Sequence, residues 1–229
     1  MSKTVEPESG SALEELTQDA SSRKRFLGMV GGAGAAGALT MFLAACGDDD
    51  EKDSAGTSGE EKKSGGGGAK SDLEIVNYAL TLEYLEAQFY ADVLKAGVVT
   101  DKAVGEAAKR IHENEEEHVD ALLATAKKLG TPAKKPKASF QKVIDGGEKM
   151  VLETAATVEN LGAAAYLGQA GRIKSKEILA AALAIHTVEG RHAAALNKIV
   201  GKSIVPDGAF AKPASMDEVL KQVKPFLVS

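Results

Sequence analysis

The chain has 229 residues, of which 44% are hydrophobic and 27% are charged, and its formal net charge is −5. This length accommodates one folded domain together with additional segments. The acidic balance argues against a nucleic-acid-binding surface, because such surfaces normally carry a basic patch or stripe. The chain contains a single cysteine, so an internal disulfide and a four-thiolate metal site are both excluded.

The first 46 residues have the pattern of a signal peptide. A basic patch at 23–25 precedes an apolar run at 26–45, and the run leads directly to Cys46. The ending Leu-Ala-Ala-Cys resembles the bacterial lipobox, which implies that Cys46 is lipidated and becomes the mature N-terminus. The basic patch resembles a twin-arginine export signal in which Lys24 stands where the second arginine belongs, so export by the twin-arginine or the general secretory route stays open.

An uncleaved transmembrane helix is the alternative interpretation, since the apolar run is about as long as the roughly 20 residues that a bilayer core requires. Both interpretations anchor the protein to a membrane and place the rest of the chain on the extracytoplasmic side of a bacterial envelope. Residues 47–70 are rich in glycine, serine and mixed charges, and such a composition cannot bury enough apolar surface to fold. The sequence therefore predicts a disordered linker at 47–70 and a folded domain at 71–229.

From residue 71 onward, apolar residues recur at steps of three and four, which is the period of an amphipathic helix. Residues 71–74 have the spacing of a capping box and predict a helix start. The absence of strand-like alternation favours an all-α, antiparallel four-helix bundle. A second capping signal at 215–218 predicts a short C-terminal helix packed across one end of this bundle. The four long helices are expected at about 71–97, 102–129, 149–169 and 175–201.

Two of the expected helices carry a Glu-x-x-His motif inside an apolar stripe, Glu115 with His118 and Glu189 with His192. Residues three apart lie on the same face of a helix, so both side chains of a pair can reach one ion. A carboxylate among isoleucine, leucine and alanine is costly to desolvate unless it is paired or binds a metal. The motifs therefore predict metal ligands in the core of the bundle.

The two motifs belong to an internal repeat. Residues 111–118 align with 185–192, and the two segments contain all four histidines of the chain. The additional histidines, His112 and His186, allow three interpretations. They are further ligands, groups that orient the motif glutamates, or surface residues.

The first and third expected helices also repeat one another, more weakly. Glu83 precedes Tyr90 by seven residues, and Glu159 precedes Tyr166 by the same interval. Glu86 lies three residues after Glu83 and is the alternative at that position, although the interval to the tyrosine favours Glu83. The two tyrosines themselves are interpreted as packing residues.

One glutamate from each of two helices and a Glu-x-x-His pair from each of the other two form the ligand set of dinuclear carboxylate bundles. On these residues the chain, over about 71–229, resembles the ferritin-like superfamily. Its ligand pattern is similar to that of bacterioferritin and rubrerythrin, and the exported ferritin-like domain family is more similar overall. The resemblance implies that Glu115 and Glu189 bridge two metal ions. It also implies four ligands that each bind one ion, namely Glu83, His118, Glu159 and His192.

Carboxylate oxygens with one imidazole per ion suit iron, with manganese as the alternative. The first functional hypothesis is an envelope-anchored di-iron oxidoreductase that oxidises Fe²⁺ or reduces O₂ or peroxide, and that depends on an external electron donor. The competing hypothesis is a non-catalytic helical bundle for stress protection or partner binding, and a manganese catalase-like site is a weaker third. The chain is also compatible with a homodimer.

Overall fold

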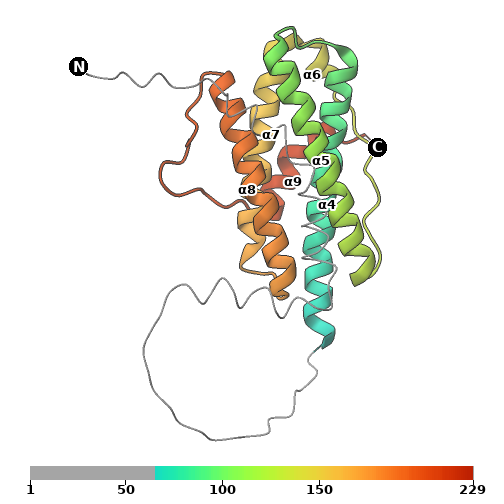
Figure 1. Ribbon diagram of the computed structural model, residues 1–229. Coiled ribbons are helices and arrows are strands. Elements are labelled where there is room, and N and C mark those ends of the chain that lie inside the picture. Colours follow the sequence, from blue (N-terminus) through green and yellow to red (C-terminus); the bar gives the residue numbers. More distant parts are fainter. Residues whose placement is uncertain (1–64, 229) are drawn as a thin grey trace, which may run out of the picture.

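The computed structural model describes residues 65–228, which form an all-helical domain (Figure 1). The prediction of an all-α four-helix bundle is confirmed. The basic patch, the apolar run, the lipobox cysteine Cys46 and most of the expected linker lie outside the described residues. The helices are α4 (Gly65–Ala96), α5 (Lys102–Leu129), α6 (Gln141–Asp145), α7 (Gly147–Ala170), α8 (Lys176–Ile199), α9 (Met216–Val223) and the 3₁₀ turn η2 (Lys224–Phe226).

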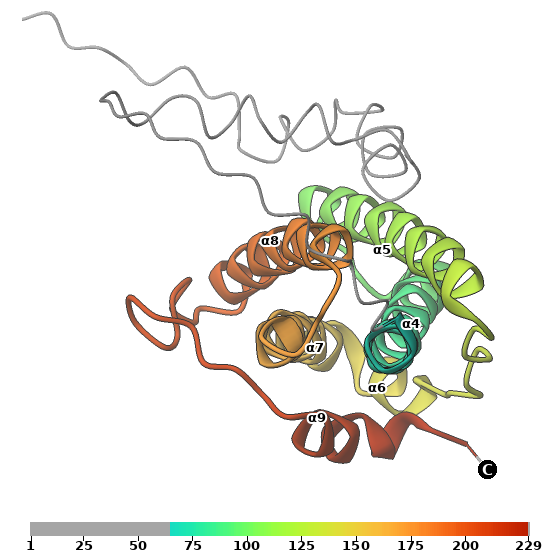
Figure 2. The ribbon, with the colours of Figure 1, turned by 90° about the horizontal axis from the view of Figure 1, so that it is seen from below.

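The bundle consists of two antiparallel hairpins, α4 with α5 and α7 with α8. The connection at 130–146 runs back along the length of the bundle before α7 begins (Figure 1). Seen along the bundle, α4 lies beside α7 and α5 lies beside α8 (Figure 2). This single long crossover is the connectivity that ferritin-like bundles use, and it brings all four long helices around one core.

Side-chain caps fix the starts of two site-bearing helices. The Asp101 carboxylate accepts a hydrogen bond from the backbone N–H of Val104 at 3.0 Å, at the start of α5. The Ser175 hydroxyl accepts one from the N–H of Ile178 at 3.2 Å, at the start of α8. Such caps satisfy N–H groups that have no partner within the helix. Helix α5 therefore has the bounds that the sequence predicts.

Helix α4 begins at Gly65, and the expected start at residue 71 is wrong. Residues 71–74 lie inside the helix, so they do not form a capping box. The Asp72 carboxylate instead accepts hydrogen bonds from the backbone N–H groups of Lys174 and Ser175, both at 2.8 Å. Asp72 thus joins α4 to the turn between α7 and α8.

Helix α9 begins with the predicted capping box, in which the side chains of Ser215 and Glu218 each accept from the other's backbone N–H. The expected position across one end of the bundle is wrong, because α9 lies against the flank formed by α4 and α7 (Figure 2). The backbone N–H of Ala214 donates to the carbonyl of Ala164 on α7 at 2.9 Å. This bond holds the segment before α9 against the side of the bundle.

The core contains two apolar clusters that follow each other along the bundle. On α5, Ile111 belongs to one cluster and Leu122 to the other, and on α8 Leu196 and Ile185 divide in the same way. The Glu-x-x-His motifs lie between these residues in both helices. The polar site is therefore enclosed by apolar layers on both sides. Among residues 65–228, no helix has the length and hydrophobicity needed to cross a membrane.

Candidate metal centre

The six residues singled out by the sequence come together in the middle of the bundle. Each of the four long helices supplies one glutamate, and all four carboxylates are 0% exposed. The four glutamates and the two histidines form two overlapping groups of four residues. Within each group, one ligand atom from each residue lies within 4.8 Å of the others. Glu115 and Glu189 belong to both groups. The first group is completed by Glu83 and His118, and the second by Glu159 and His192.

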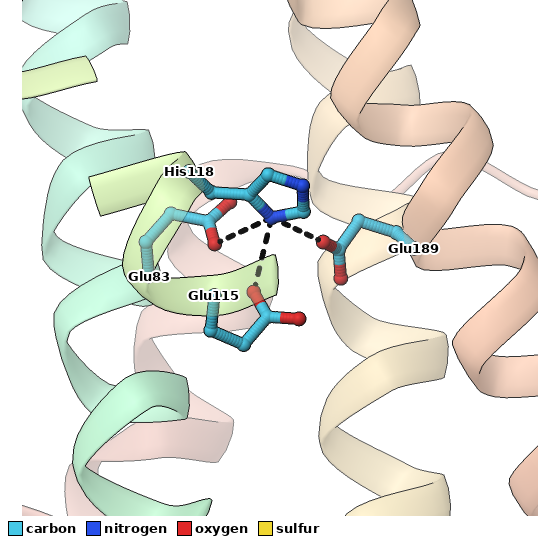
Figure 3. A group of neighbouring side chains, drawn as sticks. All are labelled: Glu83, Glu115, His118 and Glu189. Carbon is cyan, nitrogen blue, oxygen red and sulfur yellow. Dashed lines mark hydrogen bonds and ion pairs between the residues drawn. The ribbon is translucent and has the colours of Figure 1, made fainter. Parts of the chain in front are cut away.

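The two histidines turn their Nδ1 atoms toward the carboxylates. His118 Nδ1 lies 3.1 Å from Glu115 Oε2, 3.2 Å from Glu189 Oε1 and 3.3 Å from Glu83 Oε2 (Figure 3). His192 Nδ1 lies 3.0 Å from Glu115 Oε1 and 3.1 Å from Glu159 Oε2. The two oxygens of Glu115 therefore face different histidines, which is the pose that a carboxylate bridging two ions needs.

The Nε2 atom of His192 has its own partner, the side-chain oxygen of Asn114 at 3.2 Å. If Nε2 carries the proton and donates it to this oxygen, Nδ1 keeps its lone pair for a metal. A hydrogen bond on the outer nitrogen fixes both the tautomer and the ring orientation of a metal-binding histidine. The repeat places Val188 at the position that corresponds to Asn114, so the two histidines are not held in the same way.

Two tyrosines hold the remaining glutamates across the seam between α4 and α7. The Tyr90 hydroxyl donates to Glu159 Oε1 at 2.6 Å, and the Tyr166 hydroxyl donates to Glu83 Oε1 at 2.5 Å. In each glutamate the other oxygen faces a histidine. The interpretation of these tyrosines as packing residues missed this role. The repeated seven-residue interval was the available signal, but it did not identify the partner.

Burial and charge set the protonation of the site. Burial raises the pKa of Glu83 to about 7, although the facing His118 opposes the shift. Burial and the neighbouring carboxylates raise the pKa of Glu189 well above its usual value. Burial alone would lower the pKa of His118 and of His192, but the surrounding carboxylates outweigh it and raise both. Glu115 is the exception, because the two histidines outweigh its burial and lower its pKa.

The residues fit a pair of divalent cations. Glu189 Oε2 is buried and has no hydrogen-bond or ion-pair partner within the described part of the chain, and Glu83 Oε2, Glu115 Oε1 and Glu189 Oε1 have only a shared histidine Nδ1 within reach. Each buried polar atom left unsatisfied costs roughly 1–3 kcal/mol. Cations at the two groups would provide these partners and balance the four carboxylates. Carboxylate oxygens with one imidazole per group match iron or manganese.

The remaining candidates lie outside both groups. His186 Nδ1 is 3.0 Å from the carbonyl oxygen of Ala163, and His112 Nε2 is 3.9 Å from the Glu116 carboxylate. Neither histidine therefore faces the centre as a ligand. Glu86 is only 6% exposed but does not belong to either group, so the structure places Glu83, and not Glu86, beside His118.

The comparisons with known proteins agree with this architecture. The family model of the ferritin-like domain matches residues 71–202, a segment that contains all four long helices of the bundle from the second turn of α4 onward and all six residues of the centre. A search of curated proteins gave no match. The family match covers more than half of the 229 residues, and the chain therefore belongs to the ferritin-like domain family.

Proposed function

We propose that this protein holds two iron ions in the centre formed by α4, α5, α7 and α8 and oxidises Fe²⁺ with O₂ or peroxide at the outer side of a bacterial envelope. The observation that supports it is the sharing of Glu115 and Glu189 between two four-residue groups. Two ions held by these shared carboxylates would lie close enough together to act on one small oxidant.

When two ferrous ions are bound, they supply two electrons together, as in 2 Fe²⁺ + H₂O₂ + 2 H⁺ → 2 Fe³⁺ + 2 H₂O. The protein's own residues prepare the site for this chemistry. Tyr90 and Tyr166 orient Glu159 and Glu83. Burial and the adjacent carboxylates raise the pKa of both phenols, so each remains a neutral donor. The apolar layers on both sides restrict water, which strengthens the electrostatic interactions within the site.

The site releases protons as metal binds. Histidine ligands must be neutral and carboxylate ligands ionised before they bind a cation. The raised pKa values of His118, His192 and Glu83 therefore mean that binding displaces protons from these groups. The single cysteine of the chain cannot form a rubredoxin-type electron-transfer site, so return of the ions to the ferrous state requires an external donor.

The proposed location rests on the sequence alone. The lipobox-like ending at Cys46 supports lipidation there, and the glycine- and serine-rich segment that follows supports a tether between the membrane and the bundle. A lipid on each chain would hinder assembly into a closed soluble cage, which favours oxidation over storage of iron.

The test is anaerobic titration of the metal-free full chain with Fe²⁺, followed by measurement of O₂ and peroxide consumption. We expect saturation near two equivalents and metal-dependent loss of oxidant. Saturation at one equivalent would contradict the dinuclear centre. A protein that binds two ions but consumes neither oxidant would instead be a non-catalytic metal-binding bundle.

A further inference from the structure

A fifth buried carboxylate lies beside the four that form the two groups. Glu86 is one turn after Glu83 on α4 and is 6% exposed. Burial is the main cause that raises the pKa of its carboxyl well above the usual value. Repulsion by nearby carboxylates, above all Glu189, raises it further. An ionised carboxylate is costly to bury without a partner, so this residue requires an explanation.

The internal repeat pairs Glu86 with a glycine. The interval that relates Glu83 to Glu159 and Tyr90 to Tyr166 also relates Glu86 to Gly162. The repeat is therefore broken at this position, with a long acidic side chain on α4 and no side chain on α7. Glycine within a helix costs about 1 kcal/mol relative to alanine, so a buried glycine in the middle of α7 also needs a reason.

The reason is a close approach of two carboxylates to the α7 backbone. A Cβ atom at Gly162 would lie 2.9 Å from Glu189 Oε2 and 3.0 Å from Glu86 Oε1. Such distances are shorter than ordinary contacts, so any side chain at Gly162 would displace these oxygens. Glu189 Oε2 is fully buried and has no hydrogen-bond partner among the described residues. Glu86 therefore reaches the same point as an unpaired oxygen of a residue shared by both groups.

The cavity beside Glu86 offers its carboxylate no polar partner. It has a volume of about 20 Å³, and Glu86 is the one charged residue lining it within the described chain. Helix α9 closes this cavity with Val219 and Val223, and α4 and α7 supply apolar side chains such as Phe89 and Leu161. The cavity therefore gives the Glu86 carboxylate no counter-ion, whereas Glu86 Oε1 and Glu189 Oε2 approach the same point at Gly162.

We propose that Glu86 is a further ligand of the metal centre and that Gly162 provides the space for its carboxylate. This inference rests on the proposed function. The carboxylate lies outside the two groups, and rotation about its side-chain bonds would bring it toward an ion held beside Glu189. A fifth carboxylate would make the centre asymmetric, and its negative charge would favour the more highly charged ferric state.

The test uses Co²⁺ as a redox-inert probe, because its visible absorption depends on the number and type of its ligands. The full chain is titrated with Co²⁺ together with the variants Glu86→Gln and Gly162→Ala. We expect two equivalents to bind in all three proteins. In both variants we expect a changed absorption band for one ion and at least about tenfold weaker binding, since even partners outside the ligand shell contribute that much.

Gly190→Ala is the matched control. It adds the same methyl group to a helical residue next to Glu189, and a Cβ atom there has no neighbour within 4 Å. Its Co²⁺ spectrum and affinity should equal those of the native chain. Circular dichroism and melting of the metal-free proteins verify folding, and Glu86→Gln should be about as stable as the native chain because glutamine keeps the volume of the side chain.

The outcomes separate the two proposals. A native chain that fails to bind two Co²⁺ ions contradicts the dinuclear centre itself. A native chain that binds two ions, with an unchanged spectrum and affinity in Glu86→Gln, retains the centre but overturns the role of Glu86. If Glu86→Gln does not fold, Gly162→Ala decides, because a methyl group there crowds the oxygens of both Glu86 and Glu189 and would alter the ligands of one ion. A native-like spectrum in folded Gly162→Ala would then contradict the inference.

Discussion

Tyr166 on α7 donates a hydrogen bond to Glu83 on α4 at 2.5 Å, and Tyr90 returns the same interaction from α4 to Glu159. The two bonds cross the seam between the hairpins in opposite directions. Each fixes one carboxylate oxygen and leaves the other facing a histidine. The tyrosines therefore couple the packing of α4 against α7 to the geometry of the metal centre.

Removal of one tyrosine hydroxyl should weaken metal binding without abolishing it. In Tyr166→Phe, Glu83 loses the bond that orients it, and we expect about 10- to 100-fold lower affinity for one of two ions, as found for other partners of metal ligands. Calorimetric titration with Mn²⁺ or anaerobic Fe²⁺ measures this. Tyr84→Phe is the control, because Tyr84 is adjacent to Glu83 and partly buried but belongs to an apolar cluster. Equal losses in both variants would contradict the orienting role.

The membrane anchor is a separate prediction from the sequence. If Cys46 is lipidated, the mature protein begins at this residue, and mass spectrometry of the membrane fraction should detect a diacylglycerol-modified N-terminal peptide. Cys46→Ala should remain unprocessed by the lipoprotein pathway. A Cys46→Ala protein that matures normally and still partitions into membranes without lipid would favour an uncleaved transmembrane helix.

Local patterns predicted the parts of the fold that depend on neighbouring residues. The predicted bounds of α5 agree with the structure, in which Asp101 caps the start and Gly130 follows the last residue. The polar positions of the centre follow from interruptions in apolar stripes. The structure brings all six of those positions together, because helical periodicity determines which residues share a face. Antiparallel pairing of the hairpins then directs these faces to one core.

The features that sequence did not predict depend on tertiary contacts. Glycine has low helix propensity, so nothing local indicated that α4 begins at Gly65. The position of α9 depends on the bond between Ala214 and Ala164 and on the apolar flank that it covers. The partner of each tyrosine lies on another helix, and the interval along one helix cannot identify it.

The metal-free protein should lose stability as the pH rises. The pKa of Glu83 is about 7 in the folded protein and 4.5 is the usual value, so the folded state binds more protons between these values and unfolding becomes easier as they are released. The raised pKa values of His118 and His192 extend this loss above pH 6.5. The lowered pKa of Glu115 acts only below about pH 4.5.

Melting curves with a chelator between pH 5 and pH 8 measure this effect, and the melting temperature should fall across the range. Saturating Mn²⁺ should reverse the trend, because metal binding requires deprotonated ligands and strengthens as the pH rises. A metal-free melting temperature that increases from pH 5 to pH 8 would show that the buried carboxyls do not retain their protons.

The double variant Glu115→Gln with Glu189→Gln separates a metal-binding site from a purely structural polar core. Both glutamates are 0% exposed and are shared by the two groups, so their replacement should abolish binding of the second ion and all Fe²⁺-dependent consumption of O₂ or peroxide. Glutamine keeps the volume of the side chain, and the apolar clusters on both sides remain intact. The metal-free variant should therefore fold.

Stability of the two metal-free proteins completes this test. Glu189→Gln removes a carboxylate that burial and like charges disfavour, whereas Glu115→Gln removes one that pairs with two histidines. These opposing changes should leave the melting temperature of the metal-free double variant close to that of the native chain. Added Fe²⁺ should raise the melting temperature of the native chain alone, since a ligand stabilises only the state that binds it. A structural role predicts the reverse, with clear destabilisation of the metal-free variant and no response of the native chain to iron. Thermal melting and oxygen uptake of both proteins, with and without Fe²⁺, distinguish the two.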